Sequence, residues 1–177
     1  RAADALGVEM HEQTGVLSVT RKSDGSVSGV ETIKGKVKAK KVVVAVSGHT
    51  TTLTETVGLK LPLRTMNLTA FVSEPVKPLV DVIVNCSDLG FYFSQSDKGE
   101  MVIGGAPDSA QSFRRDIKQH VFEDTVGAML ELFPSFKRLK LLRQWGGHLD
   151  ITPDASPIMD ETDVSGLFVT AGWWGGY

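Results

Sequence analysis

Cysteine is nearly absent from this sequence, since Cys86 is the only one among 177 residues. A single thiol excludes an internal disulfide, and without Cys and His partners at metal-binding spacing it excludes a zinc site of the usual kind. No obvious base accompanies Cys86, so we expect a small buried residue rather than a nucleophile. We therefore predict no metal site.

An excess of charge of one sign is also lacking, because 19 Lys and Arg residues are balanced by 21 Asp and Glu residues, for a net charge of −2. The densest basic run, at positions 36, 38, 40 and 41, nearly alternates with apolar residues, which is typical of the solvent side of a strand rather than a phosphate-binding patch. A signal peptide and long apolar runs are missing. We predict a cytoplasmic protein with no nucleic-acid partner and no membrane association.

The glycine-rich fingerprints of nucleotide-binding proteins do not occur either. Neither G-x-G-x-x-G nor G-x-x-x-x-G-K-[ST] is present, so a complete dinucleotide fingerprint and a phosphate loop are excluded within these residues. The pair Gly104-Gly105 follows an expected strand but opens no helix. We therefore expect a bulge or a close backbone approach at this pair.

Glycine and tryptophan are concentrated in the last third of the sequence. Residues 145–148 read Trp-Gly-Gly-His, and an apolar strand expected at 167–170 runs into Ala-Gly-Trp-Trp-Gly-Gly-Tyr. Glycine backbone can approach a ligand closely, and tryptophan can cover a flat ring. This pattern predicts half of a cofactor site. Because the sequence stops directly after these glycines, we expect it to be part of a longer enzyme.

Short β-prone runs separated by turn residues dominate the first sixty residues. We expect a helix over 1–6, then a β-meander with strands at 8–11, 16–20, 27–33 and 36–39. The β-branched run 41–46 predicts a strand buried on both faces, and it ends at Ser47-Gly48-His49. Ligands of open α/β sheets sit at such carboxyl ends.

Longer alternating strands begin after residue 61. They predict an antiparallel sheet from runs 68–73, 82–85, 91–94 and 101–104, with a helix between 117 and 133 packed on it and a further strand at 139–145. The fold class is accordingly a mixture of α+β and α/β. We expect one unit at 1–60 and 150–177, with a second unit, 61–149, inserted into it.

Two histidines and one tyrosine are candidate site residues. His49 follows a strand at a sheet edge, where it could meet a ligand or bond local backbone, and His148 lies in the Trp-Gly-Gly-His segment. Tyr92 alternates with Phe91 and Phe93, so its side chain points to the opposite face of the strand from theirs. If that face lines a pocket, the phenol can hydrogen-bond a substrate; otherwise Tyr92 is a half-buried strand residue.

Two aspartates near residue 150 have two interpretations. Asp150 and Asp154 could form a paired acid–base site. The Thr-Pro-Asp sequence at 152–154 favours a turn instead, in which Asp154 bonds nearby backbone. We therefore do not count either aspartate among the site residues.

Taken with the glycine segments, the pattern resembles the D-amino-acid-oxidase-like family of FAD-dependent amine oxidoreductases, within it the heterotetrameric sarcosine oxidase branch. The resemblance covers nearly the whole chain, and related amine and proline dehydrogenases and glycine oxidases share much of it. Residues 145–157 are specific for the broad family. The other matching segments are 1–8, 42–49, 93–95 with 98–100, and 131–134.

The resemblance implies a Rossmann-like flavin domain assembled from the two outer segments, 1–60 and 150–177, and a substrate domain at 61–149 whose antiparallel sheet is covered by a helix. It implies FAD as the cofactor, with FMN as the alternative, in a site left incomplete because the family's N-terminal glycine-rich segment is missing here. Tyr92 and His148 are expected to line the substrate pocket. The expected cofactor-binding residues are Val16 on the adenine side and, near the flavin ring, Ser47, Gly48, His49, Gly172, Trp173, Gly175 and Gly176.

The implied activity is oxidative demethylation of sarcosine or a similar secondary amino acid, in which a hydride passes from substrate to flavin and the imine is hydrolysed to glycine and formaldehyde. Other oxidase subunits are the expected partners, and these 177 residues alone are expected to be inactive and to self-associate through apolar surface left uncovered. A non-catalytic oxidase-like scaffold that binds a partner subunit is the alternative. Within the enzymes, a dehydrogenase that passes electrons to a quinone or carrier stays open.

Overall fold

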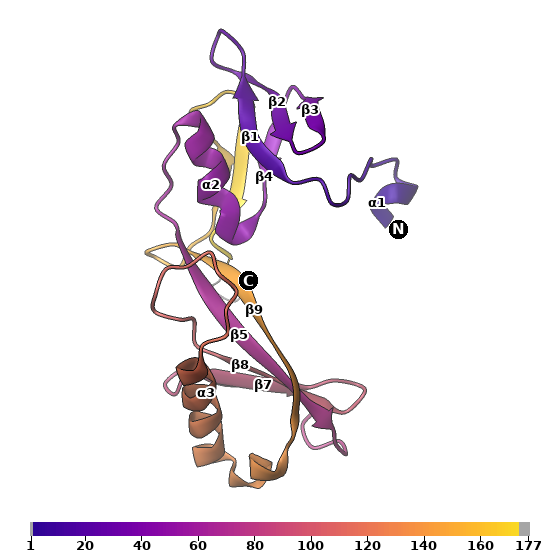
Figure 1. Ribbon diagram of the computed structural model, residues 1–177, viewed down its shortest axis with the longest axis vertical. Coiled ribbons are helices and arrows are strands. Elements are labelled where there is room, and N and C mark those ends of the chain that lie inside the picture. The colour runs from indigo at the N-terminus through magenta and orange to yellow at the C-terminus, as the bar shows by residue number, and fades with distance from the viewer. Residues whose placement is uncertain (1, 174–177) are drawn as a thin grey trace. The chain divides into compact units, whose positions relative to one another are not determined.

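The computed structural model describes residues 2–173, which divide into two compact units (Figure 1). The first unit comprises residues 2–62 and Ser156–Ala171. The second comprises Leu63–Ala155 together with Gly172 and Trp173. Residues 150–155 belong to the second unit because its last strand continues to Ile151. The assignment of a flavin role and a substrate role to separate units stays a prediction.

The first unit contains an antiparallel meander made of β1 (Val16–Arg21), β2 (Val27–Thr32) and β3 (Gly35–Lys38). The expected meander is therefore confirmed from residue 16 onward. The strand expected at 8–11 is wrong, because these residues are exposed and lie outside every strand of the described chain. A run of alternating residues does not form a strand without a neighbour to pair with. The short helix α1 (Ala2–Ala5) precedes residues 8–11.

A second sheet of this unit has the order β10-β11-β4, with β4 at Val42–Val44, β10 at Ile158–Glu161 and β11 at Leu167–Ala171. β4 runs parallel to β11, and β10 runs antiparallel to it. The expectation that the 41–46 run is buried on both faces is wrong, since Val43 is 63% exposed. The reason is that, in the described part of the chain, no element covers the face of β4 to which Val43 points, whereas Val44 on the other face is buried.

Three short helical segments follow β4 and cover part of the meander. They are η1 (Ser47–His49), α2 (Thr50–Thr54) and η2 (Glu55–Val57). Leu53 and Val57 are buried. The Thr56 hydroxyl accepts a hydrogen bond from the Val19 N–H of β1 at 3.2 Å, which ties these segments to the first sheet.

The second unit is built on a five-stranded antiparallel sheet with the order β6-β7-β8-β5-β9. The antiparallel sheet and the amphipathic helix expected from the sequence are both confirmed. Figure 1 shows α3 (Gln119–Leu132) beside this sheet, and η3 (Pro134–Arg138) follows it. The strands are β5 (Arg64–Pro75), β6 (Val84–Cys86), β7 (Phe91–Gln95), β8 (Glu100–Gly105) and β9 (Leu141–Ile151).

The two faces of this sheet have different surroundings. On the face that we call the covered face, Phe71, Phe93 and Ile103 are fully buried and Phe71 packs edge-on against Phe122 of α3, with ring centroids 5.2 Å apart. Residues at alternating positions point the other way. They form what we call the open face, which carries Tyr92 and Trp145. The hydrophobic core of the unit therefore lies on one side of the sheet only.

Candidate functional site

Tyr92 lies on the open face, on β7, the second strand of the sheet. It is paired with Gly104 of β8, Gly104 is paired with Ala70 of β5, and Ala70 is paired with Trp145 of β9. Residues directly opposite each other on antiparallel strands point to the same side. A methyl group at Gly104 would overlap the Tyr92 ring, so the ring lies across the backbone of this glycine. The close backbone approach expected at Gly104-Gly105 is thereby confirmed.

The neighbouring glycine makes the corresponding approach on the covered face. A side chain at Gly105 would overlap the hydroxyl of Thr125, a buried residue of α3. Gly104 therefore allows an aromatic ring to lie flat on the open face, and Gly105 allows a helix to pack closely on the covered face. The pair serves two different contacts.

His148 lies on the covered face, opposite to the face that carries Tyr92. It is paired with Asn67 of β5, which shares its side of the sheet with Phe71. The His148 ring contacts Phe113 edge-on, with centroids 6.3 Å apart. The expectation that Tyr92 and His148 line one pocket is therefore corrected, because a pocket on either face of this sheet receives only one of the two side chains.

The loop at 106–118 packs over the part of the covered face that carries Asn67. The side-chain amide of Asn67 donates a hydrogen bond to the backbone carbonyl of Asp116 at 2.8 Å. The backbone carbonyl of Asn67 accepts one from the Asp108 N–H at 2.8 Å. The Arg115 carbonyl lies where a side chain at Gly146 would be. Gly146 therefore admits this loop, and not a ligand as its place in the Trp-Gly-Gly-His segment suggested.

An ion pair within this loop holds its two ends together. The Asp108 carboxylate, 6% exposed as a residue, contacts the Lys118 ammonium and also accepts a hydrogen bond from the Ala110 N–H at 3.2 Å. The hydrogen bond from Lys118 keeps the pKa of Asp108 below its ordinary value, because it favours the ionised carboxylate. The loop is thus fixed by a charge pair as well as by Asn67.

The expected cofactor residues after β4 form a tight turn in the first unit. Ser47 has a left-handed backbone (φ 47°) and Gly48 is buried, whereas His49 is exposed. The Thr50 hydroxyl donates a hydrogen bond to the Ser47 carbonyl at 2.7 Å, which stabilises this turn. Since β4 and β11 are parallel, their carboxyl ends lie at the same edge of the sheet. Val16 begins β1, in the other sheet of the unit.

The segment after β11 contains the hydrogen bond that the sequence interpretation missed. Gly172 has a left-handed backbone (φ 81°), and its N–H donates to the Asp150 carboxylate at 2.6 Å. Asp150 is therefore a buried hydrogen-bond partner of the glycine segment. Trp173 follows and is partly exposed, whereas Gly175 and Gly176 lie outside the described residues. No local sequence pattern indicates this contact, because Asp150 and Gly172 are 22 positions apart.

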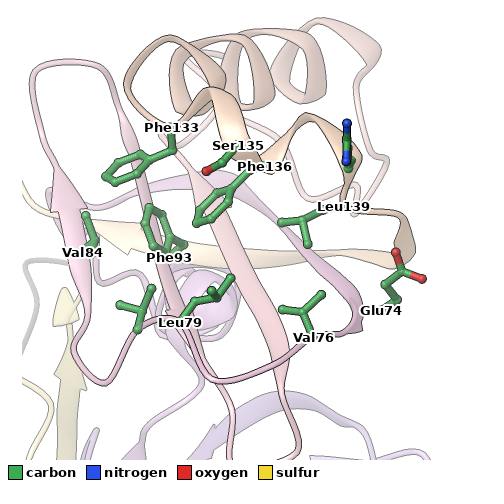
Figure 2. A pocket seen from close by; sticks show the side chains of 11 residues that line it. Glu74, Val76, Leu79, Val84, Phe93, Phe133, Ser135, Phe136 and Leu139 are labelled. Atoms are coloured by element: carbon green, nitrogen blue, oxygen red, sulfur yellow. The ribbon is translucent and has the colours of Figure 1, made fainter.

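The second unit also has an apolar groove of about 670 Å³ that contains none of the expected site residues. Figure 2 shows Phe93, Phe133 and Phe136 on one side of it and Leu79 and Val76 on the other. The Gln95 side chain holds the 76–80 wall in place, because its carbonyl accepts hydrogen bonds from the N–H groups of Leu79 and Val80. The groove is an extension of the aromatic core and has no acid–base group in its apolar part.

The described residues include no group of three or more His, Cys, Asp or Glu side chains placed to hold a metal ion. Cys86 is half-buried and packs against the core of the second unit, so it is less buried than expected. Among residues 2–173, no helix combines the length and apolar character needed to cross a membrane.

Comparison with known proteins gives a family match along the chain. Residues 1–176 match the family described as DAO, FAD dependent oxidoreductase. Two curated relatives carry the name sarcosine oxidase subunit beta. The protein from Rhodobacter capsulatus is 43% identical over 98% of this chain and 42% of its own length, and the one from Rhizobium meliloti is 38% identical over 100% of this chain and 42% of its own length.

The fold also matches solved structures. The crystal structure of L-proline dehydrogenase from P. horikoshii superposes with a TM-score of 0.89 and 22% identity, over 98% of this chain and 47% of that one. At this identity the likeness concerns the fold. The chain spans about two-fifths of the length of the two curated relatives. What those whole proteins do is therefore a proposal for this one.

Proposed function

This chain belongs to the DAO family of FAD dependent oxidoreductases, and we propose that the complete protein is a flavin-dependent amine oxidoreductase that demethylates sarcosine or a similar secondary amino acid. The observation that carries the proposal is the 43% identity, over nearly the whole chain, to a protein named sarcosine oxidase subunit beta. The general class, oxidation of an amine with FAD, rests on the family itself. The choice of sarcosine rests on the named relatives.

Two backbone features support the proposal that FAD binds where the two parallel strands end. Ser47 and Gly172 both have left-handed backbone, and Gly172 has no side chain to fill the space beside it. Nucleotide ligands of open α/β sheets sit outside the carboxyl ends of the strands. When bound, FAD supplies the acceptor for the hydride of amine oxidation. Ser47, Gly48, His49, Gly172 and Trp173 are the described residues that we propose to lie against it, and FMN stays an untested alternative.

The open face of the five-stranded sheet is the surface that we propose for the substrate. Tyr92 of β7 lies on this face, and its phenol can donate a hydrogen bond to a substrate carboxylate. Trp145 and Gly147 lie on the same face, and Gly147 leaves open space where a side chain would be. This chain's contribution is therefore to orient the amino acid. His148, on the covered face, supports the sheet from behind.

The named relatives also support a proposal about assembly. Both are called subunits, so we propose that the complete protein works with other oxidase subunits. Flavin binding separates this catalytic assignment from a non-catalytic scaffold, since a scaffold needs none.

The experiment is to express the complete protein that carries these residues, with any neighbouring subunits, and to record its visible spectrum before and after anaerobic addition of sarcosine. We expect flavin bands that bleach with sarcosine and not with equal concentrations of L-proline or glycine. Bleaching by L-proline alone would exclude sarcosine but keep a secondary amino acid as the substrate, whereas bleaching by glycine alone, a primary amine, would contradict the proposed substrate class. A protein without flavin bands would contradict the enzyme assignment.

A further inference from the structure

Asp150 joins the end of β9 to the glycine segment that follows β11. It is 3% exposed, and its carboxylate oxygen Oδ2 lies 2.6 Å from the Gly172 nitrogen. Asp150 is in register with Thr65 of β5, whose side chain is also buried, and this pairing fixes the position of the carboxylate. Both partners of the hydrogen bond belong to the second unit.

This hydrogen bond engages the backbone N–H of Gly172, a residue expected from the family resemblance to lie near the flavin ring. A backbone N–H has one hydrogen, so the Gly172 N–H that donates to Asp150 does not also bind a flavin at full strength. Gly172 contributes its shape instead: a left-handed backbone without a side chain. Hydrogen bonds from backbone N–H groups to carboxylates are among the stronger ones in proteins.

We propose that Asp150 is a positioning residue for the flavin site: its carboxylate fixes the turn at Gly172, and this turn sets how Gly172 and Trp173 are presented to FAD. The proposal rests on the proposed function, because it assumes that FAD lies against this segment. If the carboxylate is removed, the Gly172 N–H is left without its acceptor in a buried place, and the left-handed turn loses its anchor.

The variants that test this are Asp150→Ala, which removes the acceptor, and Asp150→Asn, which keeps an oxygen acceptor and removes the charge. Asp108→Asn is the matched control, since Asp108 is a buried aspartate of the same unit whose contacts are with Lys118 and Ala110. Each is made in the complete protein. FAD affinity is measured by titrating flavin-free protein at a temperature where all variants are folded, together with the positions of the bound flavin's absorption bands.

We expect FAD to bind about ten- to a hundredfold more weakly to Asp150→Ala and about two- to tenfold more weakly to Asp150→Asn, with shifted flavin bands in the alanine variant. Asp108→Asn should bind FAD within about twofold of wild type even though it unfolds more easily. If Asp150 has only a general structural role, its variants should lose stability as Asp108→Asn does, and their FAD affinity should equal that of wild type. This result would overturn the proposal.

Three further outcomes of these experiments also bear on the role of Asp150. If Asp150→Ala does not fold, the comparison of Asp150→Asn with Asp108→Asn decides, and an FAD affinity within about twofold of wild type in both overturns the proposal. If Asp150→Ala lowers the affinity for FAD but sarcosine does not bleach the wild-type flavin, the positioning role is supported and the proposed substrate is contradicted. Loss in Asp150→Ala with partial rescue in Asp150→Asn supports the proposal.

Discussion

At the scale of single residues, the direction of a side chain from its strand decides which chemistry it can reach. Tyr92 and His148 belong to one sheet, and strand pairing puts them on opposite faces of it. His148 contacts Phe113 on the covered face, whereas the Tyr92 ring lies across Gly104 on the open face. Of the two, only Tyr92 is in a position to touch a substrate on the open face.

Replacing each of these residues separately tests the assignment. Tyr92→Phe removes the proposed hydrogen bond to the substrate carboxylate, which is charge-assisted, so we expect kcat/KM for sarcosine to fall about ten- to a hundredfold. His148→Asn should leave the KM for sarcosine unchanged and lower the thermal midpoint, because the contact with Phe113 is lost. Steady-state kinetics and thermal unfolding of the complete protein measure both. A large rise in KM in His148→Asn with none in Tyr92→Phe would assign the substrate to the covered face.

At the scale of elements, the stability of the 106–118 loop depends on a charged side chain, Asp108. Asp108 accepts hydrogen bonds from Lys118 and from the Ala110 N–H. Because these lower its pKa in the folded protein, the ionised carboxylate favours folding. The contribution is complete above the ordinary aspartate pKa of 3.8 and is lost as the pH falls through the lower, folded value.

We therefore expect Asp108→Asn to lower the free energy of unfolding by about 1–3 kcal/mol at neutral pH. The difference between variant and wild type should persist down to about pH 4 and shrink below it, as Asp108 of the wild type takes up its proton. Thermal unfolding of both proteins from pH 3 to pH 7 measures this. A difference that stays constant across the range would show that the charge of Asp108 does not stabilise the loop.

Elements whose pattern is local were predictable from the sequence. The antiparallel strands of the second unit carry alternation and its helix α3 carries helical spacing, and each is present. β10 was missed because its Ile-Met-Asp-Glu sequence lacks alternation, and pairing with β11 forms it. The exposure of Val43 was missed because strand burial depends on neighbours that the strand's own residues do not specify.

The candidate site was predictable in part. The glycine-rich ends of β4 and β11 and the direction of Tyr92 relative to Phe91 follow from sequence and strand alternation. The Asp150–Gly172 hydrogen bond, the approach of Arg115 to Gly146 and the separation of His148 from Tyr92 depend on strand register and on a loop that folds back over the sheet. Contacts between distant segments leave no periodic pattern in the sequence.

At the scale of the whole molecule, the proposed function requires the open face of the antiparallel sheet to receive the substrate. The adjacent glycines Gly104 and Gly105 allow the two faces to be tested separately, because a methyl group added at each one meets a different face of the sheet. A methyl at Gly104 would displace the Tyr92 ring on the open face, and one at Gly105 would displace Thr125 and α3 on the covered face. The two variants have the same chemistry and neighbouring positions, so each is the control for the other.

The most direct measurement is the affinity of the complete FAD-loaded protein for sarcosine, from anaerobic bleaching titrations of Gly104→Ala and Gly105→Ala. We predict that Gly104→Ala weakens sarcosine binding about tenfold or more, because misplacing a substrate-contacting group by a fraction of its size is costly. Gly105→Ala should bind sarcosine within about twofold of wild type and unfold several degrees lower. The reverse pattern, with sarcosine binding impaired in Gly105→Ala and unchanged in Gly104→Ala, would contradict the assignment of the substrate to the open face.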